Sequence, residues 1–166
     1  AHFEADGEIA YGLDPDTPAR AELLERSRLF PVASPSWLAA HPPIETLDDL
    51  SRTTLIHEES RDQWRQWFEL AGHRPPGDLA GPRLWYASSA LDAAVAGQGV
   101  ALATRLQAAD DMQSGRLIEL LETDVSMGNY WFVAPEARWN DPVVSRFRAW
   151  LARSVAETRG GEGVED

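Results

Sequence analysis

Cysteine and lysine are both absent from this chain of 166 residues, and histidine occurs only 4 times. Without cysteine the chain can form no disulfide, thiolate nucleophile, iron–sulfur cluster or Cys-ligated zinc site. No apolar run approaches the roughly 18 residues of a membrane-spanning helix. The first residues, AHFEADGEIAYG, show neither the basic leader nor the apolar core of a secretory signal peptide. We therefore expect a domain that does not span a membrane and does not rely on sulfur chemistry.

Positive charge is scarce as well. The 27 acidic residues outnumber the 15 basic ones, all of which are arginine, and the formal net charge is −12. Such a charge repels DNA and anionic membranes unless a strong basic patch compensates for it. The densest arginine runs, at residues 61–65 and 146–153, are interleaved with acidic or apolar residues. We predict that this chain by itself does not bind nucleic acid.

Strand patterns and helix patterns alternate along the middle of the chain, which is typical of a layered α/β sheet with mostly parallel strands. Pro31 indicates an edge strand or a crossover. Ser34 and Thr46 are expected to cap the helices that follow them. Strands are expected at residues 7–12, 29–33, 53–57, 83–86, 100–103, 117–121 and 130–134, and helices at 36–40, 46–50, 62–71, 88–96, 106–113 and 143–155.

Ser88 and Ser89 stand between the strand at 83–86 and the helix that follows it. They lack the glycines of a Gly-x-Ser-x-Gly nucleophile elbow, so a catalytic serine is disfavoured and a helix N-cap is favoured. A helix start at the carboxyl end of a parallel strand is also where α/β sheets place ligands, and it suits a carboxylate or another small anion. The sequence does not decide whether Ser88 and Ser89 only cap a helix or also contact a ligand.

Metal and dinucleotide sites find little support in the sequence. His57-Glu58-Glu59 with Asp62 offers four possible ligands, but an acidic loop that favours the next helix N-terminus explains these residues better. Gly97-Gln98-Gly99 follows a helix and precedes a strand, which is the reverse of the order in a dinucleotide-binding fingerprint. We expect no metal, no cofactor and no catalytic residue.

The order of several motifs is distinctive. D-G-E-I-A-Y-G at 6–12 is similar to a D-x-A-I-R-Y-G strand, L-F-P-V-A-S-P at 29–35 to an L-F-P-V-x-S-P crossover, and residues 90–103 to A-L-x-A-A-x-x-G-x-G-V-A-L-A. In this order, over residues 5–152, they resemble the effector-binding domain of LysR-type bacterial transcription regulators. The resemblance is strongest to the subgroup that contains the glycine-cleavage activator and the β-lactamase regulator.

The resemblance implies a periplasmic-binding-protein-like α/β fold with two lobes, two crossover strands and a small-molecule cleft. Lobe one would comprise residues 1–28 and 130–152, and lobe two residues 36–120. The crossovers would be 29–35 and 121–129, and residues 153–166 a flexible tail. Two departures from the family stand out: Ala10 replaces the usual arginine, and the chain begins at Ala1, inside the family's first lobe. We expect the first lobe to be incomplete and the chain to associate.

The resemblance also assigns an effector site to Ser88, Ser89, His57, Glu58, Tyr11, Gly12 and Tyr130. The implied function is to sense a small anionic effector and so to modulate DNA binding by a separate N-terminal winged helix-turn-helix. The implied protein is a cytoplasmic homo-oligomer that contacts DNA only through that other domain. A transporter's solute-binding protein has the same fold and is the main alternative. An enzyme on this scaffold would need a base or a metal that the sequence does not show.

Overall fold

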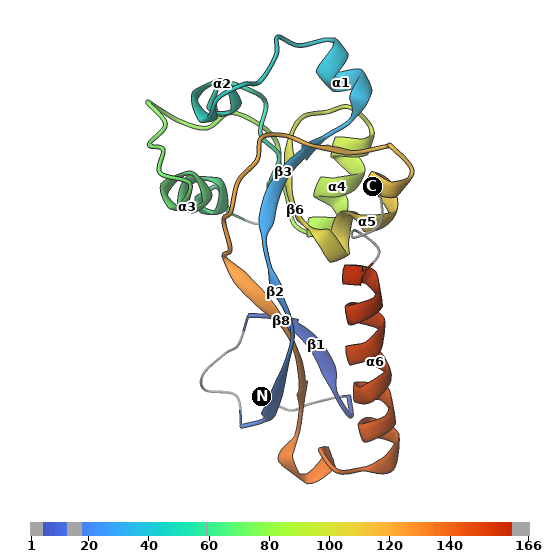
Figure 1. Cartoon of the computed structure of the whole chain (residues 1–166). Coiled ribbons are helices and arrows are strands. Elements are labelled where there is room, and N and C mark those ends of the chain that lie inside the picture. The colour runs from blue at the N-terminus through green and yellow to red at the C-terminus, as the bar shows by residue number, and fades with distance from the viewer. Residues whose placement is uncertain (1–4, 13–17, 59, 161–166) are drawn as a thin grey trace. The chain divides into compact units, whose positions relative to one another are not determined.

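The structure, a computed structural model, describes residues 5–12, 18–58 and 60–160. The chain forms two compact units (Figure 1). Unit 1 combines the residues up to Ser27 with those from Gly128 onward, and unit 2 comprises Arg28–Met127. Within the described part of the chain, no helix combines the length and the apolar character needed to cross a membrane.

Unit 1 is an antiparallel sheet of three strands with one long helix beside it (Figure 1). The sheet order is β1-β8-β2, and Phe132 and Ala134 of the central strand pack with Trp139, Val144 and Leu151. The elements are β1 (Glu8–Tyr11), β2 (Arg20–Ser27), β8 (Gly128–Ala134), the short 3-10 helix η1 (Glu136–Arg138) and α6 (Pro142–Gly160).

Part of the apolar surface of unit 1 has no cover. On α6, Val143, Phe147 and Trp150 recur at helical spacing and are exposed, while Val144 and Leu151 face the core. Ile9 of β1 is exposed too, although it lies directly opposite the buried Phe132 in the sheet register. Among the described strands β1 pairs only with β8, so its outer edge is open.

Unit 2 is built around β3, the middle strand of an antiparallel sheet of order β6-β3-β7. Strands β4 and β5 pair in parallel beside a parallel bridge between Leu55 and Val100. The strands are β3 (Leu29–Ala33), β4 (His57–Glu58), β5 (Arg83–Leu84), β6 (Ala101–Thr104) and β7 (Ile118–Glu119). The helices are α1 (Pro35–Ala39), α2 (Leu47–Ser51), α3 (Asp62–Leu70), α4 (Ala87–Val95) and α5 (Arg105–Gln113).

Two apolar clusters hold unit 2 together. The first gathers Trp64, Trp67 and Phe68 of α3, which are fully buried and in mutual ring contact. Both indoles are satisfied, because Trp64 Nε1 donates to the Ile56 carbonyl at 2.9 Å and Trp67 Nε1 to the Leu29 carbonyl at 2.8 Å. The second cluster is rich in alanine from α4 and β6, and such small side chains let a helix approach the sheet closely.

The predicted sheet direction is wrong: β4–β5 and the Leu55–Val100 bridge are parallel, but the other described strand pairs are antiparallel. Alternation of strands and helices indicates parallel pairing only when successive strands become neighbours, and here β3 pairs with the distant β6 and β7. Pro31 therefore lies in a middle strand and does not mark an edge.

Some of the predicted helix and strand positions are confirmed and others are not. Ser34 and Thr46 are N-caps as predicted, and each accepts a hydrogen bond from the backbone of the first helical turn. Strand β2 was not predicted. Helix α6 continues to Gly160, past the boundary at 152 expected for the flexible tail, and residues 161–166 lie outside the described residues.

Candidate functional site

Helix α4 begins without a side-chain cap. Its N-cap is Tyr86, whose backbone is extended at φ −126° and ψ 144°, and no cap hydrogen bond from a side chain is found among the described residues. The prediction that Ser88 or Ser89 caps this helix is therefore wrong, because both lie inside its first turn. Uncapped first-turn amides carry the partial positive charge of the helix and attract anions.

The carboxyl ends of β4 and β5 lie side by side just before this helix start. In the parallel register His57 pairs with Arg83 and Glu58 with Leu84, and the His57 N–H donates to the Pro82 carbonyl at 2.8 Å. Helix α4 contacts both strands. Helix α4 therefore lies against both strands, and the register places His57 and Glu58 in the strand that pairs with the one leading into α4.

His57 is completely buried, at 0% exposure. Burial lowers its pKa, the Arg61 cation lowers it further, and the Leu79 backbone opposes both effects. The Leu79 backbone is close enough to act on the ring, but no hydrogen bond of good geometry reaches either ring nitrogen within the described residues. The imidazole therefore stays neutral at neutral pH and lies beneath the surface, on the side of Arg61 and Leu79, which flank α3 and β5.

Glu58 is half-buried at the end of β4. Burial raises the pKa of its carboxyl group, and a hydrogen bond from the Gln63 side chain partly offsets this. Gln63 belongs to α3, so Glu58 is hydrogen-bonded to that helix. A carboxylate that is costly to keep charged favours a nearby hydrogen-bond donor or cation.

Three of the predicted residues come together in unit 1. Tyr11 and Tyr130 are paired in the β1–β8 register, and their ring centroids are 5.1 Å apart. Gly12 follows with φ +81°, and its N–H donates to the Asn129 carbonyl at 2.9 Å. These residues form an aromatic corner at the end of β1.

Sequence reasoning missed the exposure of Trp85 and Tyr86, which connect β5 to α4. Each is 72% exposed, and the Arg83 guanidinium lies 5.8 Å from the Trp85 ring centroid. Two consecutive aromatic residues at the end of a strand could have predicted exposure. Neighbouring side chains of a strand point to opposite faces of the sheet, and both faces are rarely covered at a strand end.

Clustered metal ligands are not found in the part of the chain that the structure describes, where no group of three or more acidic, histidine or cysteine side chains could hold an ion. Glu59, one of the four ligands considered above, lies outside the described residues.

Residues 1–156 match the family model described as the LysR substrate binding domain. The chain belongs to this family. Its LysR-type relatives include the glycine cleavage system transcriptional activator of Escherichia coli strain K12, which is 32% identical over 156 residues. That alignment covers 93% of the chain and 51% of the activator. The transcriptional activator AmpR of Citrobacter freundii is 29% identical, with 88% of this chain and 50% of AmpR covered.

Solved structures agree with the LysR assignment. The AmpR effector-binding domain from Citrobacter freundii has a TM-score of 0.78 at 26% identity. The superposition covers 92% of this chain and 75% of that domain. The AmpR effector domain from Pseudomonas aeruginosa has a TM-score of 0.77 at 28% identity, with 96% and 76% covered. These matches confirm the α/β, periplasmic-binding-protein-like fold class. The LysR relatives are transcription regulators and not enzymes, and the chain spans about half the length of the curated ones.

Proposed function

We propose that this LysR domain senses a small anionic metabolite, with the start of α4 as the anion-binding element. The observation that carries the proposal is the uncapped first turn of α4, which follows the parallel pair β4–β5 in a chain of the LysR substrate-binding family. The backbone amides and the hydroxyls of Ser88 and Ser89 supply donors suited to a carboxylate.

The other predicted residues have distinct roles in this proposal. Glu58, with its raised pKa, would accept a hydrogen bond from a donor group of the effector, and the buried His57 would support the strand end from below. In unit 1, Tyr11, Gly12 and Tyr130 stay candidate effector residues on the strength of their own ring surface and turn, independently of the α4 start. Trp85 and Tyr86 are added as residues that flank the α4 start.

Effector binding would shift the equilibrium between conformations of the domain and thereby change DNA binding by the whole regulator. DNA contact is assigned to a separate N-terminal winged helix-turn-helix, because the net charge of −12 disfavours DNA binding by this chain. The whole protein would act as a homo-oligomer in the bacterial cytoplasm, where LysR-type regulators meet DNA.

A thermal-shift screen of carboxylates, amino acids and short peptides tests the proposal. A ligand at 100 times its Kd should stabilise the domain by about 2.7 kcal/mol and raise its melting temperature. Replacing Ser88 and Ser89 with alanine should weaken binding by about two- to tenfold per lost hydrogen bond. Stability without ligand should change little, because neither serine is a cap.

The matched control is Ser114→Ala, on the exposed C-cap of α5, which should leave affinity unchanged. The proposal fails if no carboxylate or peptide-like metabolite shifts the melting temperature. It also fails if the control variant loses as much affinity as the double variant.

A further inference from the structure

Unit 1 has an apolar surface, here called the open flank, that β1 and α6 form together (Figure 1). Its exposed side chains are Ile9, Tyr11, Val143, Phe147 and Trp150. Ile9 lies opposite Phe132 in the sheet register, so both side chains point to the same face of the sheet. The ring centroid of Phe132 is 6.0 Å from that of Phe147, which is 5.7 Å from that of Trp150. The strand and the helix therefore contribute to one surface.

The backbone of β1 gives the open flank a hydrogen-bonding edge. The Gly12 N–H donates to the Asn129 carbonyl at 2.9 Å, which continues the β1–β8 register and makes this a hydrogen-bonded pair. Hydrogen-bonded and non-hydrogen-bonded pairs alternate along an antiparallel ladder, so Ala10 bonds to β8 and Ile9 does not. The N–H and the carbonyl of Ile9 therefore point away from β8, toward an edge where no described strand pairs with β1.

A second copy of β1 is complementary to this edge when a two-fold axis passes between the two Ile9 residues. Each Ile9 then exchanges both backbone hydrogen bonds with its counterpart, and both side chains lie on the face that carries α6. Glu8 faces Ala10 of the other copy, so no two carboxylates are opposed. Tyr11 faces Gly7, which has no side chain to obstruct the ring. A slip by one residue would put the two isoleucines on opposite faces.

The same symmetry places both copies of α6 on one face of a continuous sheet. The three strands of each copy would give the order β2-β8-β1-β1-β8-β2. The two β8 strands, against which α6 packs, would lie three strand spacings apart, or about 14 Å. Helices in direct contact are about 8–10 Å apart. The remaining gap suits large side chains, and Phe147 and Trp150 of each copy supply them.

The size of the open flank is sufficient for a dimer of moderate affinity. A buried aromatic side chain covers about 150–250 Å², and Tyr11, Phe147 and Trp150 are each close to half exposed. With Ile9 and Val143, each copy offers about 400 Å² of apolar surface. Two copies and their paired backbones would bury roughly 1,000 Å², the lower bound for a specific interface. The dissociation constant should be on the order of 10–100 µM.

Charge predicts how this association depends on salt. A net charge of −12 on each copy opposes the approach of a second one. On the flank itself, the exposed Arg146 and Arg153 lie one turn before and one turn after Trp150, so this side of the chain is less negative. Salt screens the long-range repulsion and leaves the apolar contact intact. Association should therefore strengthen from low to moderate salt.

We propose that the open flank of unit 1 binds a second copy of this chain. The two β1 strands pair antiparallel about Ile9, and the two α6 helices pack over the isoleucine pair. The interface is symmetric, so each side chain of the flank contributes twice. The start of α4 takes no part in it, and either proposal can fail without the other.

Hydrogen exchange of the ¹⁵N-labelled chain at several concentrations, combined with sedimentation equilibrium, tests the register. The Ala10 N–H bonds to β8 within each copy, so its protection should not depend on concentration. The Ile9 N–H is bonded only in the dimer, so its protection should increase with the dimer fraction found by sedimentation. Protection of Ile9 that is the same at all concentrations would assign the edge to the same chain and overturn the proposal.

Two variants separate the strand contact from the helix contact. Ile9→Pro removes the outward N–H and leaves the ladder to β8 intact, because edge strands tolerate proline. It should weaken the dimer about tenfold or more, since one hydrogen bond is lost for each copy. Trp150→Ser should weaken the dimer by a similar factor, because an aromatic contact is lost twice.

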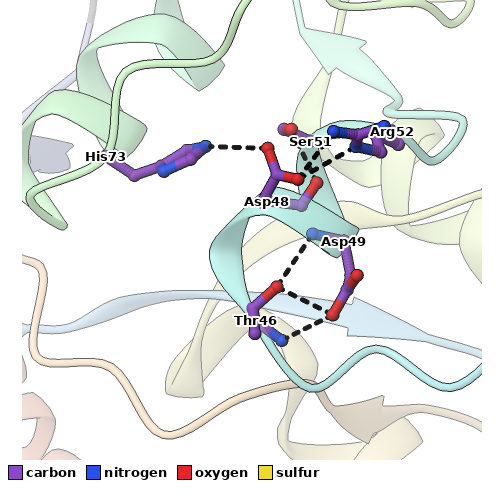
Figure 2. A network of polar contacts seen from close by, with 6 residues as sticks. All are labelled: Thr46, Asp48, Asp49, Ser51, Arg52 and His73. Atoms are coloured by element: carbon purple, nitrogen blue, oxygen red, sulfur yellow. Dashed lines mark hydrogen bonds and ion pairs between the residues drawn. The ribbon is translucent and has the colours of Figure 1, made fainter.

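Two control variants lie in unit 2. Ile118→Lys changes an exposed isoleucine of β7, which is also an edge strand, and it should leave the dimer unchanged. Thr46→Ala removes the cap of α2, where Thr46 Oγ1 accepts from the Asp49 N–H at 3.1 Å (Figure 2), and shows whether lower stability alone weakens association. A monomer at all concentrations, a dimer that survives both flank variants, or an equal loss in either control would overturn the proposal. The amide spectrum of each variant shows whether it is folded.

Discussion

Replacing the buried His57 with leucine should stabilise unit 2, although most substitutions of a fully buried residue destabilise a protein. Neither ring nitrogen makes a hydrogen bond of good geometry among the described residues, although the Leu79 backbone lies close enough to act on the ring. A buried polar group without a partner costs about 1–3 kcal/mol. Leucine is similar in size, so repacking should cost less than about 1.5 kcal/mol. The expected net gain in the free energy of unfolding is therefore at most about 3 kcal/mol, and it shrinks toward zero when repacking takes its full cost.

The gain should grow in mildly acidic solution. The pKa of His57 is lowered by burial and by Arg61, so below its ordinary value near 6.5 the unfolded chain takes up a proton that the folded chain does not. The stability of the unmodified protein therefore falls as the pH decreases from 6.5 toward the lowered pKa. His57→Leu removes this contribution. The raised pKa of Glu58 acts in the opposite sense, but it acts in both proteins.

Urea unfolding followed by tryptophan fluorescence at pH 7.5 and 5.5 measures both effects. The exposed His41, whose Nδ1 lies 2.7 Å from the Trp37 carbonyl, supplies the control substitution His41→Leu, which should bring no gain. A loss of more than about 1 kcal/mol in His57→Leu, or a difference that does not change with pH, would refute the reasoning. The imidazole would then have a partner in the folded protein.

Three further predictions concern the caps, the core and the open surface. Thr46→Ala should cost about 0.5–2 kcal/mol in urea unfolding, because it removes the N-cap of α2, and an unchanged midpoint would contradict the capping box. Trp67→Phe should cost about 1–3 kcal/mol, since the Leu29 carbonyl loses its donor, and a neutral effect would show that water replaces the indole. The chain should self-associate in sedimentation experiments, and Trp150→Ser should weaken this association; a monodisperse monomer before the substitution would count against it.

The sequence predicted those elements whose signals are local. Ser34 followed by Pro35, and Thr46 followed by the acidic Asp48 and Asp49, are short-range signals of a helix start, and both helices begin at these signals. The fold class followed from a series of motifs that retain their order, and the LysR family match confirms it. Such features need no knowledge of which strands become neighbours.

Features that depend on tertiary contacts were not predictable. Strand β2 has a register shift between Leu23 and Glu25, and this bulge interrupts the two-residue alternation by which a strand is recognised. Tyr86 occupies the N-cap of α4 through its backbone alone, so a rule based on short polar side chains chose the serines after it. The burial of His57 is set by α3 and the chain near Leu79, which lie outside its own sequence neighbourhood.

The distribution of tryptophan gives each unit its own optical reporter. In unit 2 the hydrogen-bonded indoles of Trp64 and Trp67 are shielded from water, so their emission should be blue-shifted and protected from iodide, whereas Trp85 should be quenched. In unit 1 the buried Trp139 should be the protected emitter and the exposed Trp150 the quenched one. Single-tryptophan variants would therefore let the unfolding of the two units, and ligand arrival beside α4, be followed separately in one sample.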